Sequence, residues 1–117
     1  MQLAELPTRV AHERARAEEA VPRLLAAGLK GRIATLACDA NVHVGTAVGW
    51  VLRAAELLGP HGAAIISAKN FSGGAAVWRA DVGAAEVALR SAGFCRVERV
   101  HLFANGVQEV TIVAWRG

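Results

Sequence analysis

The chain has 117 residues, of which 54% are hydrophobic and 20% are charged, so its composition excludes a disordered protein and suits a single packed domain. Its 13 Lys and Arg and 10 Asp and Glu residues give a formal net charge of +3. These charges are interleaved along the chain, a pattern compatible with a polyanionic partner but not typical of a dedicated nucleic-acid-binding domain. The sequence has no run of about 18 apolar residues, so we expect no membrane-spanning helix.

The cysteines and the first residues of the sequence indicate in which cellular compartment the protein is located. Cys38 and Cys95 lie at the edges of apolar runs and predict buried free thiols in a reducing environment. Residues 1–7 lack the positive start and apolar stretch of a secretory signal, and early glutamates argue against an organelle transit peptide. We therefore expect an intracellular protein, with cytoplasm, nucleus and organelle all left open.

The first part of the chain, residues 1–31, is predicted to be a helical segment that precedes the main domain. Thr8 can cap its helix, and Pro22 predicts a kink or a restart, because proline cannot donate a helical hydrogen bond. Gly28 is a natural C-terminal glycine. Residues 32–117 are then expected to form the α/β domain.

The domain is predicted to start with a strand and a helix. Residues 32–38 have the apolar composition of a buried strand, which ends at Asp39. A loop follows, and a helix is expected to open at Gly45 or Thr46. The dipeptide Gly59-Pro60 is predicted to stop that helix and form a turn.

A second strand and helix follow. Residues 63–68 are almost wholly apolar, as in a strand that is buried on both faces, and they end on Lys69. Residues 75–80 show no clear pattern. Asp81 is predicted to cap a helix that Gly93 closes.

The last two strands are predicted to form a hairpin. Residues 96–103 read as a strand, and Asn105-Gly106 is a strong signal for a tight hairpin turn. Residues 109–115 are nearly continuous in β-forming side chains, which predicts a central strand. We therefore expect an α/β fold of parallel strands with a terminal antiparallel hairpin strand and helices on the faces.

This topology predicts a cluster of charged side chains at one rim of the sheet. Asp39 and Lys69 end neighbouring parallel strands, which lie about 4.8 Å apart, and Glu109 begins the strand that runs the other way. A lysine between two carboxylates is held in position and kept charged. Open α/β sheets place their ligands at this end of the strands. Charged strand ends are also common where a chain meets water, so a surface salt bridge is the alternative interpretation.

These residues resemble the FtsJ-like RNA ribose 2′-O-methyltransferases, a family of class I S-adenosylmethionine (SAM)-dependent enzymes. The family carries an Asp-x-x-Pro-Asn-like loop after one strand, Lys-x-Phe followed by small residues after the next, and a Glu that opens the final strand. The matching segments here are Asp39-Ala-Asn41, Lys69-Asn-Phe71-Ser-Gly-Gly74 and Gln108-Glu109-Val-Thr-Ile-Val-Ala. The resemblance covers residues 32–116 and implies the carboxyl half of a Rossmann-like methyltransferase sheet.

The resemblance also implies roles. Asp39 would be the acidic catalytic residue beside the cofactor methyl group, with Asn41 also on the cofactor. Lys69 would orient and deprotonate the ribose hydroxyl, and Glu109 would position that lysine. The implied cofactor is SAM, and the implied partner is RNA, as in the methylation and processing of ribosomal RNA. The residues implied to contact the substrate are Phe71, Gly73 and Gly74.

The sequence departs from the family in its first half. The family has a preceding half with a glycine-rich loop that holds the cofactor, whereas Gly28 and Gly31 here flank a segment that we interpret as a turn. The chain is therefore expected to be an incomplete domain or one piece of a split enzyme. Alternatives are a non-catalytic interaction module derived from such a half-domain, and a fibrillarin-like or other class I methyltransferase fragment. The exposed edge of strand 32–38 predicts a homo-oligomer or a complementary half-domain as partner.

Other candidate residues carry weaker signals. His43 is interpreted as a solvated loop residue, with contact to cofactor or substrate as the alternative. Trp50 and Trp115 are assigned to the core. Trp78 either stacks on a base or packs beneath its loop. The four histidines and two cysteines show no metal-binding spacing.

Overall fold

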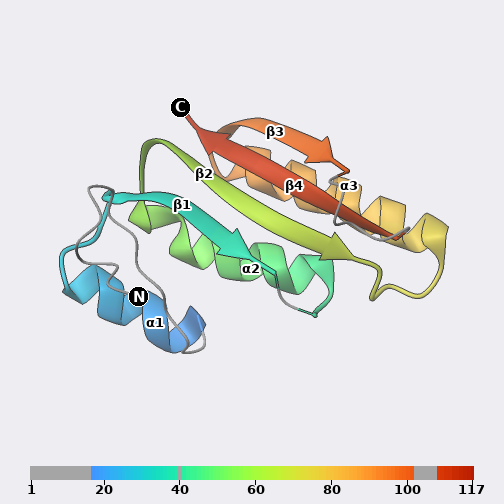
Figure 1. Cartoon of the computed structure of the whole chain (residues 1–117), viewed down its shortest axis with the longest axis horizontal. Coiled ribbons are helices and arrows are strands. Elements are labelled where there is room, and N and C mark those ends of the chain that lie inside the picture. Colours follow the sequence, from blue (N-terminus) through green and yellow to red (C-terminus); the bar gives the residue numbers. More distant parts are fainter. Residues whose placement is uncertain (1–16, 40, 102–107) are drawn as a thin grey trace.

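The computed structural model describes residues 17–39, 41–101 and 108–117 (Figure 1). Its elements are α1 (Ala17–Ala26), β1 (Ile33–Cys38), α2 (Val44–Ala54), the 3₁₀ helix η2 (Ala55–Leu57), β2 (Leu58–Lys69), α3 (Ala75–Ser91), β3 (Phe94–Val100) and β4 (Glu109–Arg116). The strands form one mixed sheet in the order β1-β2-β4-β3, in which β1 and β2 are parallel and β4 is antiparallel to both of its neighbours. The predicted α/β fold and the central position of the last strand are confirmed.

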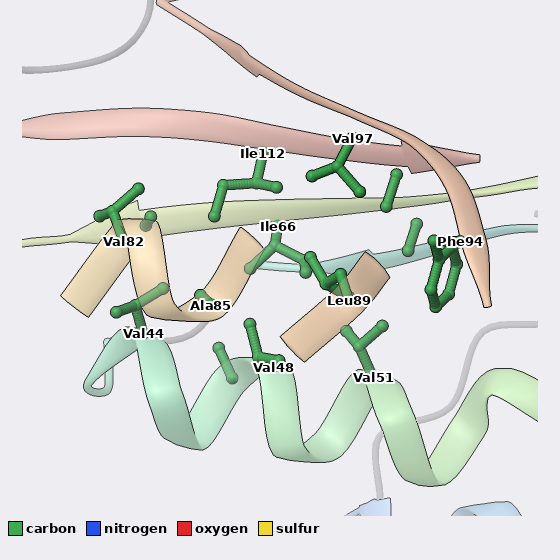
Figure 2. Packing of buried hydrophobic residues seen from close by; sticks show 14 of the residues in the cluster. Val44, Val48, Val51, Ile66, Val82, Ala85, Leu89, Phe94, Val97 and Ile112 are labelled. Atoms are coloured by element: carbon green, nitrogen blue, oxygen red, sulfur yellow. The ribbon is translucent and has the colours of Figure 1, made fainter. Parts of the chain in front are cut away.

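Helices α2 and α3 pack on the same face of the sheet and enclose the main core (Figure 2). Helical periodicity places Val44, Val48 and Val51 on one side of α2, where they meet the apolar side chains of α3 and of the strands. Burial of these side chains is the main favourable term in folding. The largest fully buried side chains are Leu57, Ile66, Leu89, Ile112, Val44 and Val82.

The strands are buried on one face and more open on the other, which corrects the prediction for β1 and β2. Ala64, Ile66 and Ala68 of β2 are fully buried toward the helices, whereas Ile65 is 37% exposed on the opposite face. Strand β1 is not buried either: its residues are exposed or half-buried, because it lies at an edge of the described sheet. An apolar run does not distinguish burial on two faces from burial on one.

Helix α1 packs beside α2 and η2 through Val21 and Leu57. Pro22 lies inside this helix, so the predicted restart near it is wrong, whereas the alternative of a kink stays a prediction. The predicted end is confirmed, since Gly28 has a positive φ of 84° and donates its N–H to Leu25 O. The proposed cap Thr8 lies outside the described residues.

The segment between α2 and β2 differs from the predicted turn. The α-helix ends at Ala54, and Gly59-Pro60 lies within β2 instead of ending a helix. The register between β1 and β2 is irregular here, and His61 has a positive φ of 61°. Gly59 lies so close to the preceding turn that a Cβ atom on it would sit 2.7 Å from Gly31 O. The glycine therefore serves a close backbone approach between the two segments.

Helix α3 starts seven residues before the predicted position. Gly74 is its N-cap residue and Ala75 its first residue, so residues 75–80 are helical and Asp81 lies inside the helix. Trp78 is 7% exposed and belongs to the core, which confirms the packing alternative for this residue. Trp78 is one of the apolar residues that anchor the first turns of α3, and this anchoring depends on tertiary packing that local sequence does not show.

Several single-residue predictions need correction. Cys38 is half-buried and Cys95 is exposed, and neither of these described cysteines forms a disulfide. Trp50 and Trp115 are half-buried instead of in the core, and Arg96 stacks over the Trp115 ring at 4.4 Å. Trp115 lies on the face of β4 that α2 and α3 leave uncovered. Among the described residues, no helix is long and apolar enough to cross a membrane.

Candidate functional site

Lys69, the last residue of β2, is the centre of the predicted site. Its ammonium donates to Asp39 Oδ1 and to Asn41 Oδ1, both at 2.8 Å. Glu109, the first residue of β4, is its register partner across the antiparallel ladder. The structure thus brings Asp39, Asn41, Lys69 and Glu109 together at the carboxyl ends of β1 and β2.

Asp39 and Lys69 each stabilise the ionised form of the other. The hydrogen bond from Lys69, followed by one from Ser67, lowers the pKa of the Asp39 carboxyl. The hydrogen bond to Asp39 raises the pKa of Lys69 despite opposing desolvation, and Glu109 adds a smaller Coulombic contribution in the same direction. The Lys69 side chain is 23% exposed and that of Asp39 is 75% exposed. Lys69 is therefore a positioned cation at neutral pH.

The loop after Lys69 is tied to the start of β4. Phe71 N donates to Lys69 O at 3.0 Å, so the chain turns immediately after the lysine. Asn70 N donates to Gln108 O at 3.1 Å, and the Asn70 amide donates to Gln108 Oε1 at 2.7 Å. Asn70 Oδ1 in turn accepts from Ser72 N at 3.0 Å. Asn70 thus bonds both to Ser72 within the loop and to Gln108, the residue directly before β4.

A second set of contacts ties the same loop to both core helices. Ser72 Oγ donates to Asp81 Oδ2 at 2.6 Å, and His43 Nε2 lies 2.9 Å from the same oxygen. His43 is also the N-cap of α2, where its Nδ1 accepts from Gly45 N at 2.9 Å. The two hydrogen bonds lower the pKa of Asp81, with the larger contribution from Ser72. The His43 side chain is 42% exposed, as predicted for a loop residue, but both of its ring nitrogens have hydrogen-bond partners.

Sequence reasoning missed this Ser72–Asp81–His43 network. A histidine just before a helix is a weak local signal for a cap, and Asp81 was interpreted as a cap itself. The contact between His43 and Asp81 joins residues 38 positions apart in the chain, and it depends on how α2 and α3 pack. No local pattern predicts such a contact.

The residues implied to contact the substrate lie on the outer side of this loop. Phe71 is 52% exposed, and Gly73 and Gly74 are exposed. Gly73 has a φ of 105°, a conformation that residues with a Cβ rarely adopt. These residues follow Lys69 closely in the chain, but within the described residues Asp39 and Asn41 are bonded to Lys69 and not to them.

The described residues supply only part of a cofactor site. The two side chains implied to contact SAM, Asp39 and Asn41, each use an oxygen to hold Lys69. Gly28 and Gly31 lie in a turn before β1 and donate to Leu25 O and Glu56 O, so this turn has a structural role. The described part of the chain therefore does not fit a complete SAM site, and it contains no cluster of three or more potential metal ligands.

The sheet order, with its antiparallel β4 between β2 and β3, defines half of a Rossmann-like sheet of the class I methyltransferase fold. The solved structures that share it include two of M1.HpyAVI, one of them in complex with SAM. They match with TM-scores of 0.55 and 0.61 at 19% identity, and cover 88% and 87% of this chain. No protein-family model and no curated protein matches the sequence.

These matches establish the fold and its extent. The chain spans about half the length of the solved structures it matches, 51% and 50%. The predicted methyltransferase-like half-domain is thus confirmed as a fold. The finer prediction of an FtsJ-like RNA enzyme is not part of that finding, since a match at 19% identity shows the fold alone.

Proposed function

We propose that this chain is the acceptor-side half of a SAM-dependent methyltransferase domain that modifies the 2′-hydroxyl of RNA ribose. The observation that carries the proposal is the Lys69 ammonium, held at 2.8 Å by both Asp39 and Asn41 at the ligand-binding end of the sheet. The methyltransferase fold supports the reaction class. The choice of RNA ribose depends on the order of the Asp39, Lys69 and Glu109 motifs.

In this proposal Lys69 orients the hydroxyl group that accepts the methyl. An ammonium has three N–H donors, and Asp39 and Asn41 accept two of them. The third can donate to the ribose oxygen and hold it in line with a methyl donor. Because Asp39 and Glu109 favour the charged form, Lys69 acts by orientation and is a poor base. The proton of the reacting hydroxyl would then pass to solvent, to which the Asp39 side chain is 75% exposed.

The test is methyl transfer from tritium-labelled SAM to RNA, followed by digestion to nucleosides and chromatography. We expect label in 2′-O-methyl nucleosides, loss of label in Lys69→Ala, and normal transfer in Lys30→Ala, which changes an exposed lysine in the turn before β1. Label in a base or in DNA contradicts the ribose assignment. Absence of transfer by the full chain contradicts catalysis by this chain without a partner.

One observation favours a second function, a non-catalytic module that docks a complementary half-domain. The face of the sheet opposite α2 and α3 includes Ala37 and the 37% exposed Ile65, and β1 lies at the described edge. Such an edge pairs readily with another strand. The half-length match to M1.HpyAVI supports the remaining half of the same fold as the occupant.

Photo-crosslinking separates this function from catalysis. A crosslinking amino acid at Ile65, with one at the 61% exposed Val87 on α3 as control, would be used in the native cells. Mass spectrometry of the adducts should identify a segment with a strand and a glycine-rich loop at Ile65 alone. Adducts with a second copy of this chain, or equal adducts at both positions, contradict docking of a complementary half.

A further inference from the structure

Phe71 is an exposed aromatic ring on a loop that is tied down on both sides. The exposed large hydrophobic side chains among the described residues are Ile65, Phe71, Val77 and Val87, and Phe71 alone is aromatic. Exposure of 52% leaves about half of its surface open to solvent. A flat, open aromatic face is the feature on which proteins stack unpaired bases.

The residues on either side of Phe71 are fixed to different parts of the fold. Asn70 is bonded to Gln108 through both backbone and side chain, at 3.1 and 2.7 Å. Ser72 is bonded to Asp81 at 2.6 Å, and Asp81 is bonded to His43 at 2.9 Å. The ring is thus presented by a short loop that is anchored to β4 on one side and to α2 and α3 on the other.

The protonation of this network follows from its contacts. His43 Nδ1 accepts from Gly45 N, so the proton of a neutral ring is on Nε2, which donates to Asp81. Asp81 Oδ2 accepts from both Ser72 and His43, and its carboxylate form is favoured. Loss of the Asp81 carboxylate therefore removes the bonds that tie both Ser72 of the loop and His43, the N-cap residue of α2, to α3.

We propose that Phe71 is the stacking platform for one unpaired nucleobase of a single-stranded substrate, and that Ser72, Asp81 and His43 are positioning residues that hold it. The inference rests on the proposed function, because the base would belong to a nucleotide near Lys69. Phe71 N donates to Lys69 O at 3.0 Å, so the ring follows the amine within one tight turn. A base inside a duplex is already stacked on both faces, so the platform selects single strands.

A preformed platform has a physical advantage over a mobile one. Binding to a flexible loop must also order the loop, which lowers affinity. The hydrogen bonds of Asn70 and Ser72 supply that order before the substrate arrives. Their loss should weaken binding even though neither side chain needs to touch the base.

The test is binding of a fluorescein-labelled single-stranded RNA to the full chain, followed by fluorescence anisotropy. We expect Phe71→Ala to weaken binding by about 5- to 150-fold, the range that loss of one stacked base produces. Val77→Ala, which changes a 53% exposed apolar residue on α3, is the control and should bind as the wild type does. A matched RNA hairpin should bind more weakly than the single strand.

Positioning is separated from general stability by double variants. Asp81→Asn and Ser72→Ala should each weaken binding, whereas either change combined with Phe71→Ala should bind no more weakly than Phe71→Ala alone. Ser72→Ala deletes a single hydroxyl and keeps the test valid if an Asp81 variant unfolds. Circular dichroism verifies the fold of every variant.

Each outcome decides a different point. Equal binding by wild type and Phe71→Ala, equal affinity for hairpin and single strand, or no binding by the wild type would overturn the platform. Additive losses in the double variants would overturn the positioning role. If the single strand binds through Phe71 but ribose methylation is absent, the platform stands and the proposed function fails.

Discussion

The Lys69 ammonium lies 2.8 Å from the Asp39 carboxylate, although Lys69 ends β2 and Asp39 directly follows β1. Parallel pairing of β1 with β2 produces this contact, because Cys38, which precedes Asp39, is in register with Ile66 near the end of β2. The antiparallel β4 adds Glu109 opposite Lys69. Three segments that are far apart in the sequence thus each contribute one charged residue to the same small site.

The ion pair at Asp39 should be visible as a shifted titration. We expect the pKa of Asp39 in the folded chain to lie below the ordinary value of 3.8, and to rise toward it in Lys69→Met, which removes the dominant hydrogen bond. Because the folded-state pKa is lowered, the stabilisation is present above pH 3.8 and is lost as the pH falls through the lowered value. Carboxyl carbon-13 chemical shifts measure the pKa directly. Equal values in wild type and variant would contradict the contact.

Truncation of a core side chain should lower the free energy of unfolding far more than truncation of a side chain on the outer face of α3. Leu89 is fully buried between α3 and the sheet, so Leu89→Ala should lower the free energy of unfolding by about 2–5 kcal/mol. Val87→Ala on the same helix changes a 61% exposed side chain and should alter it by no more than about 0.5 kcal/mol. Urea titration followed by circular dichroism measures both. Similar losses in the two variants would contradict the assigned packing of α3.

Two glycine-to-alanine substitutions should have opposite effects on the stability of the fold. Gly49 lies within α2 and a Cβ atom there meets nothing within 4 Å, so Gly49→Ala should stabilise the fold by about 0.5–1 kcal/mol. In Gly59→Ala the new methyl would sit 2.7 Å from Gly31 O, and the backbone must shift to relieve the clash. We expect this variant to unfold at a lower temperature than the wild type. A stabilising effect of Gly59→Ala would refute the close approach of these two segments.

Trp78 should tolerate loss of its indole nitrogen. The Nε1 group is buried and has no hydrogen-bond partner in the described part of the chain, and an unpaired buried donor costs about 1–3 kcal/mol. Trp78→Phe removes that cost but leaves a smaller ring in the core, so the free energy of unfolding should change by less than about 1 kcal/mol. Chemical denaturation is the measurement. A loss above about 2 kcal/mol would show that the N–H is bonded in solution.

Much of the fold could be predicted because its signals are local. Gly28 and Gly93 end helices with positive φ, as expected for C-terminal glycines, and the crossover and hairpin rules predict the strand directions. The hairpin turn assigned to Asn105-Gly106 lies outside the described residues, but β3 and β4 do pair antiparallel. The meeting of Asp39, Lys69 and Glu109 follows from the same topology.

The failures arose where tertiary contacts override local patterns. Gly59-Pro60 has the composition of a turn, yet pairing with β1 and the approach to Gly31 draw it into β2. Asp81 resembles a helix cap, yet burial of Trp78 extends α3 toward its N-terminus past it. The partner of Asp81 is His43, on a different element, and that pairing exists only once both helices have packed on the sheet.

The place of β4 in the sheet also has a consequence for how the protein is made. The ribosome synthesises β1, β2 and β3 before β4, but β3 reaches β2 only through β4. Until β4 emerges, β3 has no strand to pair with and the apolar side chains of α3 lack Ile112 and Ala114. The nascent chain therefore exposes its half-built core throughout this period, which makes it a natural client for chaperones that shield apolar surface during translation.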